Sequence, residues 1–340
     1  MSNSYNGIIE SKYLPKLFFN KEKKPRHVGV EVEFSNLDLR TSVKLVNSIF
    51  PGKIEEENKY YLQLTKTEYG DFNFELDAKL LQKMQTDGIF EKLSDLIGDI
   101  SNDLDKLVDK TSKKIVPYEI ATPPIPISKM YKLDEMVEKL RLNGALGTTN
   151  SLQYAFGVHF NVEIPSEEIE DNFRLFKSFL ILQKWIEIQS EVDIVRKISP
   201  FINDFPKDFI KKVIDLDYQP TKDQFIEDYL EFNPTRNRIL DMLPMLAYWD
   251  EKKVRDTLPK EKINKRPTFH YRLPNSKVDQ LRWGLSHEFQ PWIIIELLAS
   301  NEKIFNQLSK QFLEELDSTI FNKSKWIEQC HKSVLDLLSS

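Results

Sequence analysis

The sequence is poor in cysteine and glycine, and each shortage excludes a class of site. Its single cysteine, Cys330, rules out an internal disulfide and a metal site built from paired cysteines. The 10 glycines show no GxxxxGK(S/T) or GxGxxG spacing, which disfavours a P-loop or a Rossmann phosphate cradle. Lysine and arginine total 48 against 53 acidic residues, and this lack of a basic excess argues against binding to nucleic acid.

Long hydrophobic runs are missing as well. The longest apolar stretches, such as Trp292–Ile295, are far short of a membrane span, and residues 1–26 lack the apolar core of a signal peptide. We therefore expect a cytoplasmic protein that binds no membrane. A hydrophobic share of 40% and a charged share of 30% are typical of a globular protein with a sizeable core.

Helical and strand-like segments alternate along the chain. No repeat or Gly/Ser linker separates them, so we expect an N-terminal tail over residues 1–26 and a single catalytic domain over 27–340, helical from about 285 onward. Ser128 is the expected cap of one helix and Asn143-Gly144 its end. Apolar spacings of three and four predict helices over 78–112, 129–143, 166–198, 222–232, 236–249, 288–316 and 324–338.

Five shorter segments alternate apolar and polar residues, which predicts strands with one buried face. In residues 28–34 the valines and Phe34 occupy one face, and Glu31 and Glu33 project from the other. The other segments are 71–77, 117–121, 157–163 and 268–273, and their polar positions hold Asp71, Asn73, Glu75, Asp77, Glu119, His159, Asn161, Glu163, His270 and Arg272.

The residue types on these polar faces are unusual. A solvated face would explain any one strand alone, but such faces favour Lys, Thr, Ser and Gln, whereas these collect Glu, Asp, His and Asn. Carboxylates packed on one sheet face repel each other unless cations neutralise them. Oxygen-rich ligands with an occasional histidine suit Mg²⁺ or Mn²⁺ better than structural zinc. The pattern therefore predicts a polar sheet face that binds a divalent metal ion.

The same strands carry short motifs in a fixed order. They read GVEVEF at 29–34, ELDAKL at 75–80, YEIATPP at 118–124, FGVHFNV at 156–162 and TFHYRLP at 268–274. This series resembles the motifs of the amidoligases, a carboxylate–amine ligase group with the fold of glutamine synthetase and glutamate–cysteine ligase. Two positions depart from that pattern, since His270 stands where the family usually has Glu and Lys79 where it has Ser.

The resemblance implies an α+β fold, in which an antiparallel sheet has a polar concave active-site face and helices pack on the other face. It also implies an ATP- and Mg²⁺-dependent (or Mn²⁺-dependent) ligase that joins a small-molecule or peptide carboxylate to an amine through an acyl-phosphate. Two alternatives stay open because a fold does not fix a function. One is a phosphotransferase on the same fold, and the other is a degenerate module that binds a nucleotide or peptide, which the His270 substitution favours.

Under this resemblance the polar residues divide into roles. Arg236 and Arg238 could bind a substrate carboxylate or the nucleotide, or could be surface residues at the start of a helix. His270 could be a ligand or a neutral structural partner. Glu75 and Glu163 could be supporting or surface groups. The substrates and the oligomeric state are not specified by the sequence. The expected metal ligands are Glu31, Glu33, Asp77, Glu119, His159 and His270, the catalytic residues Arg272, Glu33 and Asn161, and the nucleotide-binding residues Arg272, Asn161, Arg236 and Arg238.

Overall fold

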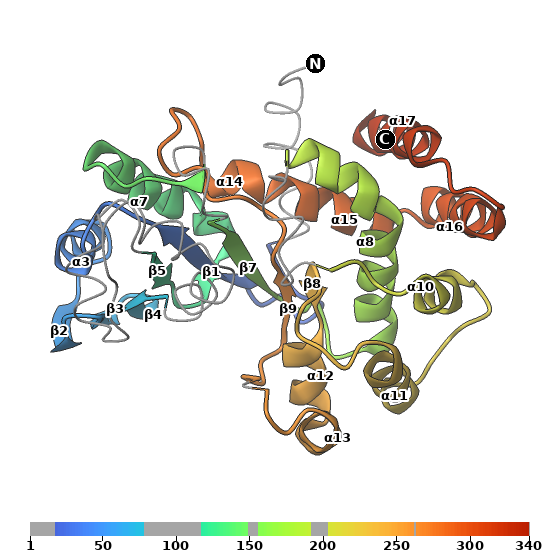
Figure 1. The fold of residues 1–340 in the computed structure, drawn as a ribbon, viewed down its shortest axis with the longest axis horizontal. Coiled ribbons are helices and arrows are strands. Elements are labelled where there is room, and N and C mark those ends of the chain that lie inside the picture. The colour runs from blue at the N-terminus through green and yellow to red at the C-terminus, as the bar shows by residue number, and fades with distance from the viewer. Residues whose placement is uncertain (1–17, 78–116, 149–155, 192–202, 262, 340) are drawn as a thin grey trace, which may run out of the picture.

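The computed structural model describes residues 18–77, 117–148, 156–191, 203–261 and 263–339. Within these segments nine strands form one open antiparallel sheet in the order β2-β3-β4-β5-β1-β7-β9-β8, with β6 also paired to β1 (Figure 1). The strands are β1 (His27–Phe34), β2 (Lys53–Asn58), β3 (Tyr61–Thr67), β4 (Gly70–Leu76), β5 (Tyr118–Ala121), β6 (Ile125–Pro126), β7 (Val158–Glu163), β8 (Leu240–Asp241) and β9 (Thr268–Tyr271).

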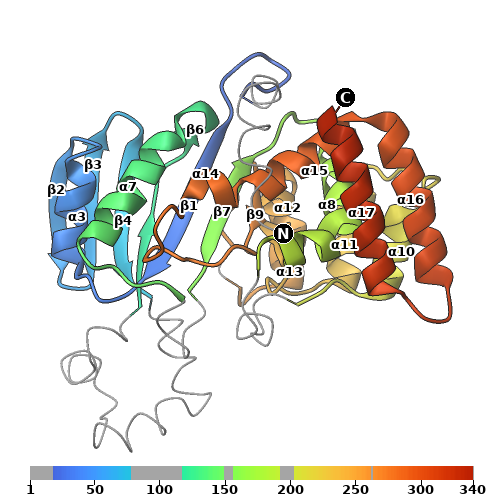
Figure 2. The same cartoon turned by 90° about the horizontal axis from the view of Figure 1, so that it is seen from above.

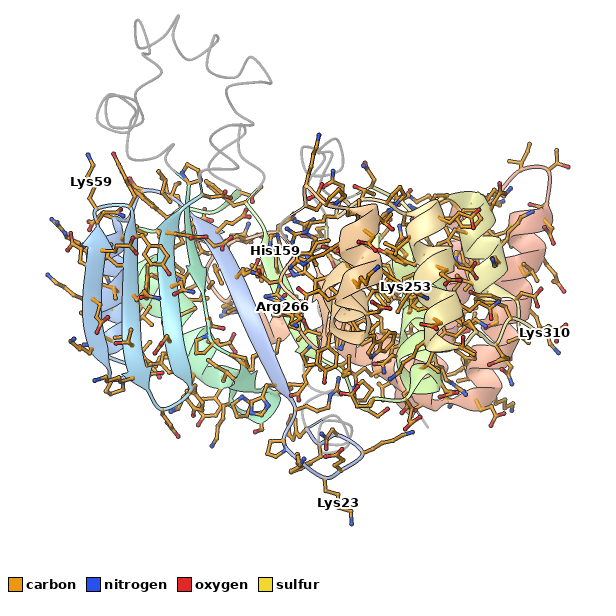
Figure 3. The ribbon with its side chains drawn as sticks, turned by 90° about the horizontal axis from the view of Figure 1, so that it is seen from below. Lys23, Lys59, His159, Lys253, Arg266 and Lys310 are labelled. Carbon is orange, nitrogen blue, oxygen red and sulfur yellow. The ribbon has the colours of Figure 1, made fainter. Side chains whose placement is uncertain are left out.

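Helices α3, α7, α14 and α15 lie over one face of the sheet, and α8, α10, α11, α12, α13, α16 and α17 gather beside its β9 end (Figures 1 and 2). The view from the opposite side shows the other face of β2, β3, β4 and β5 with no described helix in front of it (Figure 3). The helices are α3 (Leu39–Asn47), η1 (Ile127–Lys129), α7 (Tyr131–Leu142), α8 (Ile169–Gln189), α10 (Lys207–Ile214), α11 (Lys222–Phe232), α12 (Leu243–Trp249), α13 (Glu251–Thr257), α14 (Leu285–Glu288), α15 (Gln290–Ser300), α16 (Glu302–Asp317) and α17 (Lys323–Ser339).

The apolar sides of the central strands form the core beneath the helices. Val30 and Val32 of β1 are fully buried. On β7 the ring of Phe160 lies 5.3 Å from that of Phe289, and on β9 the ring of Phe269 lies 5.2 Å from that of Trp292 in α15. Burying one such side chain stabilises the fold by about 1.5–3 kcal/mol. Because a strand alternates its faces, this burial fixes the carboxylates and histidines of β1, β7 and β9 on the opposite face.

A buried ion pair joins the start of β1 to α15. Arg26 is 1% exposed, and its guanidinium donates to both carboxylate oxygens of Glu296, at 2.7 Å and 2.9 Å. It also donates to the backbone carbonyl of Glu163 on β7, at 2.8 Å, and the indole of Trp292 donates to Glu296 at 2.6 Å. This network sets the position of β1, the strand that carries Glu31 and Glu33.

The five predicted strands are confirmed as β1, β4, β5, β7 and β9, and the helices predicted over 222–232 and 324–338 are confirmed as α11 and α17. The helix predicted over 129–143 is confirmed as α7, but its expected cap is wrong. Ser128 lies in the 3-10 turn η1, and α7 begins after Met130 without a side-chain cap. The helix ends as expected before Gly144, whose φ of +92° suits glycine.

Two of the longer predicted helices are shorter or interrupted. The pattern over 166–198 gives α8, which ends at Gln189, and Glu191 just beyond adopts φ +45°. The pattern over 288–316 is broken at Asn301, whose side chain accepts the backbone N–H of Ile304 and starts a new helix, α16. An asparagine offers the backbone this alternative bond, which apolar spacing does not reveal.

The helix predicted over 236–249 was wrong in its first half. Within it only Leu240 and Asp241 form a regular element, strand β8, because they pair with β9, and α12 begins at Leu243. The helix predicted over 78–112 lies outside the described residues. Within the described segments, no helix has the length and apolarity that crossing a membrane requires.

Candidate active site

Sheet register brings six polar side chains together. Three antiparallel ladders on the open face place chemically reactive residues directly opposite each other, where side chains on one face are in contact range. The cross-strand pairs are Glu31 with His159 between β1 and β7, Glu33 with Glu119 between β1 and β5, and Asn161 with His270 between β7 and β9.

A continuous hydrogen-bond chain links four of these side chains. Glu31 accepts from Asn161 Nδ2 at its Oε1 (2.9 Å) and from His159 Nδ1 at its Oε2 (2.8 Å). A carboxylate only accepts, so the amide of Asn161 turns its NH₂ toward Glu31 and its oxygen toward His270. His270 Nδ1 lies 2.6 Å from that oxygen and therefore carries the proton. The Nε2 of neutral His270 is thereby left with a lone pair.

Glu33 and Glu119 lie on the other side of His159. One oxygen of Glu33 accepts the backbone N–H of Gly157 at 2.6 Å, and the other lies 3.9 Å from His159 Nε2. The backbone of Glu119 is paired with β1 and β4, but its carboxylate makes no hydrogen bond within the described part of the chain. Because His159 donates its Nδ1–H to a carboxylate, its Nε2 is a strong candidate ligand facing Glu33, the arrangement usual for metal-binding histidines.

The pKa values of Glu31 and Glu119 are shifted in opposite directions. Burial would raise the pKa of Glu31, but the hydrogen bond from His159 and the charge of Arg266 oppose it, and that pKa lies well below its ordinary value. Burial raises the pKa of Glu119 well above its ordinary value, and the charges of Glu31 and Glu33 raise it further. Glu31 is thus compensated, whereas no cationic side chain of the described segments offsets the charge of Glu119.

The far end of the cluster is neutral. Burial lowers the pKa of His270 well below its ordinary value. The charge of Glu31 opposes this shift, and the charge of Arg272 adds to it. An imidazole that stays neutral is competent to bind a metal ion. Asp241 lies opposite His270 in the β8–β9 ladder and is fully buried, and burial raises its pKa against the opposing charges of Arg272 and Arg236.

Two sets of side chains in the described residues could hold a metal ion, and they share His159. One is Glu31, His159 and His270, and the other is Glu33, Glu119 and His159; in each set the ligand atoms lie within 4.8 Å of one another. Carboxylate oxygens with one imidazole fit Mg²⁺ or Mn²⁺. The uncompensated Glu119 makes the second set the better-formed one.

Arg272 follows β9 directly, and the other predicted arginines lie beyond it. Arg272 donates through Nη1 to the backbone carbonyl of Arg236 at 2.9 Å, and Arg236 Nε lies 3.4 Å from the buried carboxylate of Asp241. Both therefore border the His270 end of the cluster. Arg238 instead donates to the carbonyl of Asp204 and lies 5.5 Å over the ring of Phe205, so the structure does not bring it to the cluster.

Of three further acidic residues from the polar strand faces, two lie beside the cluster. Asp77 follows β4, with its N–H bonded to the carbonyl of Pro117 at 3.0 Å, and its charge helps to raise the pKa of Glu119. It belongs to neither candidate ligand set. Glu75 acts on Glu119 in the same way. Glu163 is occupied elsewhere, because it accepts the backbone N–H of His27 at 2.8 Å.

The sequence reasoning missed Arg266 and Asp241. Arg266 precedes β9, and its Nη2 lies 3.7 Å from Glu31 Oε1; Figure 3 shows it close to His159, where the strands meet the later helices. It has the same strand parity as His270 and Arg272, so extending that segment backward would have found it. Asp241 had a signal too, as a lone carboxylate within the apolar run 239–243.

Comparison with known proteins identifies the family of the chain. A family model described as "Putative amidoligase enzyme" matches residues 24–294. Neither the comparison with curated proteins nor that with solved structures gave a match. The matched segment includes all nine strands and every residue of the cluster. The chain therefore belongs to this amidoligase family of enzymes.

Proposed function

We propose that the protein is a carboxylate–amine ligase that uses ATP with Mg²⁺ or Mn²⁺ and forms an amide through an acyl-phosphate. The observation that carries the proposal is the crowding of Glu31, Glu33 and Glu119 around His159 on one open sheet face, with Glu119 left uncompensated. Such crowding costs stability unless a cation binds. A divalent ion there would neutralise the polyphosphate and the charge that develops during phosphoryl transfer.

The chain's own residues then have definite tasks. Glu33, Glu119 and His159 would hold the metal ion, and Glu31 would keep the His159 ring oriented through the 2.8 Å hydrogen bond. Arg272 would stabilise charge on the transferred phosphoryl group from the His270 side of the cluster. Asn161 holds Glu31 and would also orient a phosphate oxygen or a water molecule.

The substrates follow from the chemistry of ligation. One must carry a carboxylate, small or peptidic, that accepts the γ-phosphoryl group, and the other an amine that displaces the phosphate. The open polar face of β4 and β5 beside Glu119 is where we place the amine, because Glu75 and Asp77 add negative charge there that favours an ammonium group.

Hydroxylamine trapping tests the reaction class. The purified protein is incubated with ATP, Mg²⁺, hydroxylamine and pools of amino acids and peptides, and both ADP and hydroxamate are measured. A ligase gives ADP and hydroxamate together, and Glu33→Gln gives neither. The control is Glu328→Gln, which changes an exposed carboxylate on α17 and should match the wild type. ADP with a phosphorylated acceptor and no hydroxamate would instead indicate the phosphotransferase, and nucleotide binding without ADP the degenerate module.

A further inference from the structure

The guanidinium of Arg266 lacks a close hydrogen-bond acceptor among the described residues, although its backbone is firmly placed. Its backbone is fixed on both sides, since its N–H donates to Pro244 at 3.1 Å and its carbonyl accepts from Thr268 at 2.8 Å. The guanidinium reaches Glu31 only at 3.7 Å, beyond hydrogen-bond distance. Its Nε is buried and makes no hydrogen bond within the described part of the chain.

The buried ion pair of Arg26 and Glu296 provides a comparison, because it serves a structural role. Arg26 grips Glu296 through two bonds of 2.7 Å and 2.9 Å, and both side chains are buried. Arg266 lacks this two-point grip on Glu31, and its side chain is 32% exposed. Both oxygens of Glu31 already accept hydrogen bonds, so Arg266 contributes charge there and keeps its donors for another acceptor.

We infer that Arg266 is an exchangeable counter-ion: it balances Glu31 while the cluster holds no metal ion, and it turns to the phosphate groups of ATP once a divalent cation on Glu33, Glu119 and His159 supplies positive charge beside Glu31. This inference rests on the proposed function. Its physical basis is repulsion, because a guanidinium beside Glu31 disfavours a second cation in the same cluster. A polyphosphate draws the guanidinium away through bidentate hydrogen bonds and so favours metal binding.

This exchange gives Arg266 opposite effects on two affinities. Removing the charge should tighten binding of the metal ion alone and weaken binding of the nucleotide. A side chain that only supports the fold would weaken both. Arg266→Lys separates the parts, because it keeps the charge near Glu31 and loses the planar donor fork.

The experiment measures Mn²⁺ binding to the full chain by titration calorimetry without nucleotide, and then binding of a β,γ-methylene ATP analogue at saturating Mn²⁺. Arg266→Met should bind Mn²⁺ about tenfold more tightly than the wild type and the analogue about tenfold more weakly. Arg266→Lys should keep the wild-type Mn²⁺ affinity and bind the analogue weakly. The matched control is Lys265→Met, which removes a neighbouring charge that pairs with Glu251 instead, at 2.7 Å.

Thermal unfolding establishes that each variant is folded. Equal Mn²⁺ affinity of the wild type and Arg266→Met would overturn the inference and leave the proposed function standing. Weaker binding of both Mn²⁺ and the analogue by Arg266→Met would also overturn it, in favour of a structural role. If neither protein binds Mn²⁺ with or without the analogue, both the inference and the proposed function fail.

Discussion

His159 Nδ1 lies 2.8 Å from Glu31 Oε2, and the Nε2 of the same ring faces Glu33 at 3.9 Å. Glu31 therefore orients the imidazole, and Glu33, the next residue on the same face of β1, lies near the other ring nitrogen. Two residues of spacing in a strand are enough to give the two carboxylates these different tasks.

Glu31→Gln should impair the site without unfolding the protein. The glutamine amide presents an NH₂ where a carboxylate oxygen accepted from His159 or Asn161, so the ring loses its fixed orientation and Nε2 its basicity. We expect Mn²⁺ affinity and ADP release to fall about 10- to 100-fold. Calorimetry and a coupled ADP assay measure both, with Glu328→Gln as the control. Unchanged values would show that Glu31 does not orient His159.

Glu119→Gln should stabilise the metal-free protein at alkaline pH. Because the folded-state pKa of Glu119 is raised, its contribution to stability is full below the unfolded pKa of about 4.3 and is lost as pH rises through the folded pKa. At pH 8 the free energy of unfolding of the variant should therefore exceed that of the wild type by about 1–3 kcal/mol, and the difference should vanish near pH 4. Denaturant unfolding at the two pH values measures it.

Adding Mg²⁺ supplies the control for that prediction. A cation at Glu119 stabilises the native wild type but not the variant, so the difference at pH 8 should shrink or reverse with Mg²⁺. A variant less stable than the wild type at pH 8 without metal would contradict the uncompensated charge.

His270→Glu restores the residue that the amidoligase motif usually has. A second carboxylate cannot donate to the Asn161 oxygen, which His270 Nδ1 approaches to 2.6 Å, and it adds negative charge beside Glu31. The metal-free variant should lose about 1–3 kcal/mol of stability and gain affinity for Mn²⁺. Unfolding curves with and without Mn²⁺ test both changes. Weaker Mn²⁺ binding would instead identify His270 as a ligand that glutamate does not replace.

Removing one partner of the Arg26–Glu296 ion pair should destabilise the fold, whereas replacing both partners should cost little. Arg26→Met leaves Glu296 buried and uncompensated, which should cost about 3–5 kcal/mol. The double variant Arg26→Met/Glu296→Leu should recover most of that loss, because no buried charge remains. Denaturant midpoints of the single and double variants measure the effect. Equal stability of the single variant and the wild type would show that the pair does not hold β1 on α15.

The strands that carry the site were predictable, and those at the margins of the sheet were not. Alternation in residues 28–34 and 157–163 reports one buried face, so it gave both the strands and the shared side of Glu31 and His159. Strand β2 shows no such alternation, because the edge strand Lys53–Asn58 is charged and mostly exposed.

The arginines show where the sequence is insufficient. Parity along one strand could have revealed Arg266, but nothing local distinguishes Arg236 from Arg238. Their tertiary partners do: Arg236 lies beside the buried Asp241, and Arg238 donates to the carbonyl of Asp204. Long side chains in a loop take their direction from such contacts, which only the folded chain defines.

The location of the metal ion decides whether Glu33, Glu119 and His159 form the catalytic centre. Crystals grown with Mn²⁺ and the β,γ-methylene ATP analogue would show the ion by anomalous scattering. We expect a peak within bonding distance of Glu33, Glu119 and His159, with the phosphates of the analogue on the same side of the sheet. A bound analogue whose Mn²⁺ peak lies away from all three side chains would contradict the account.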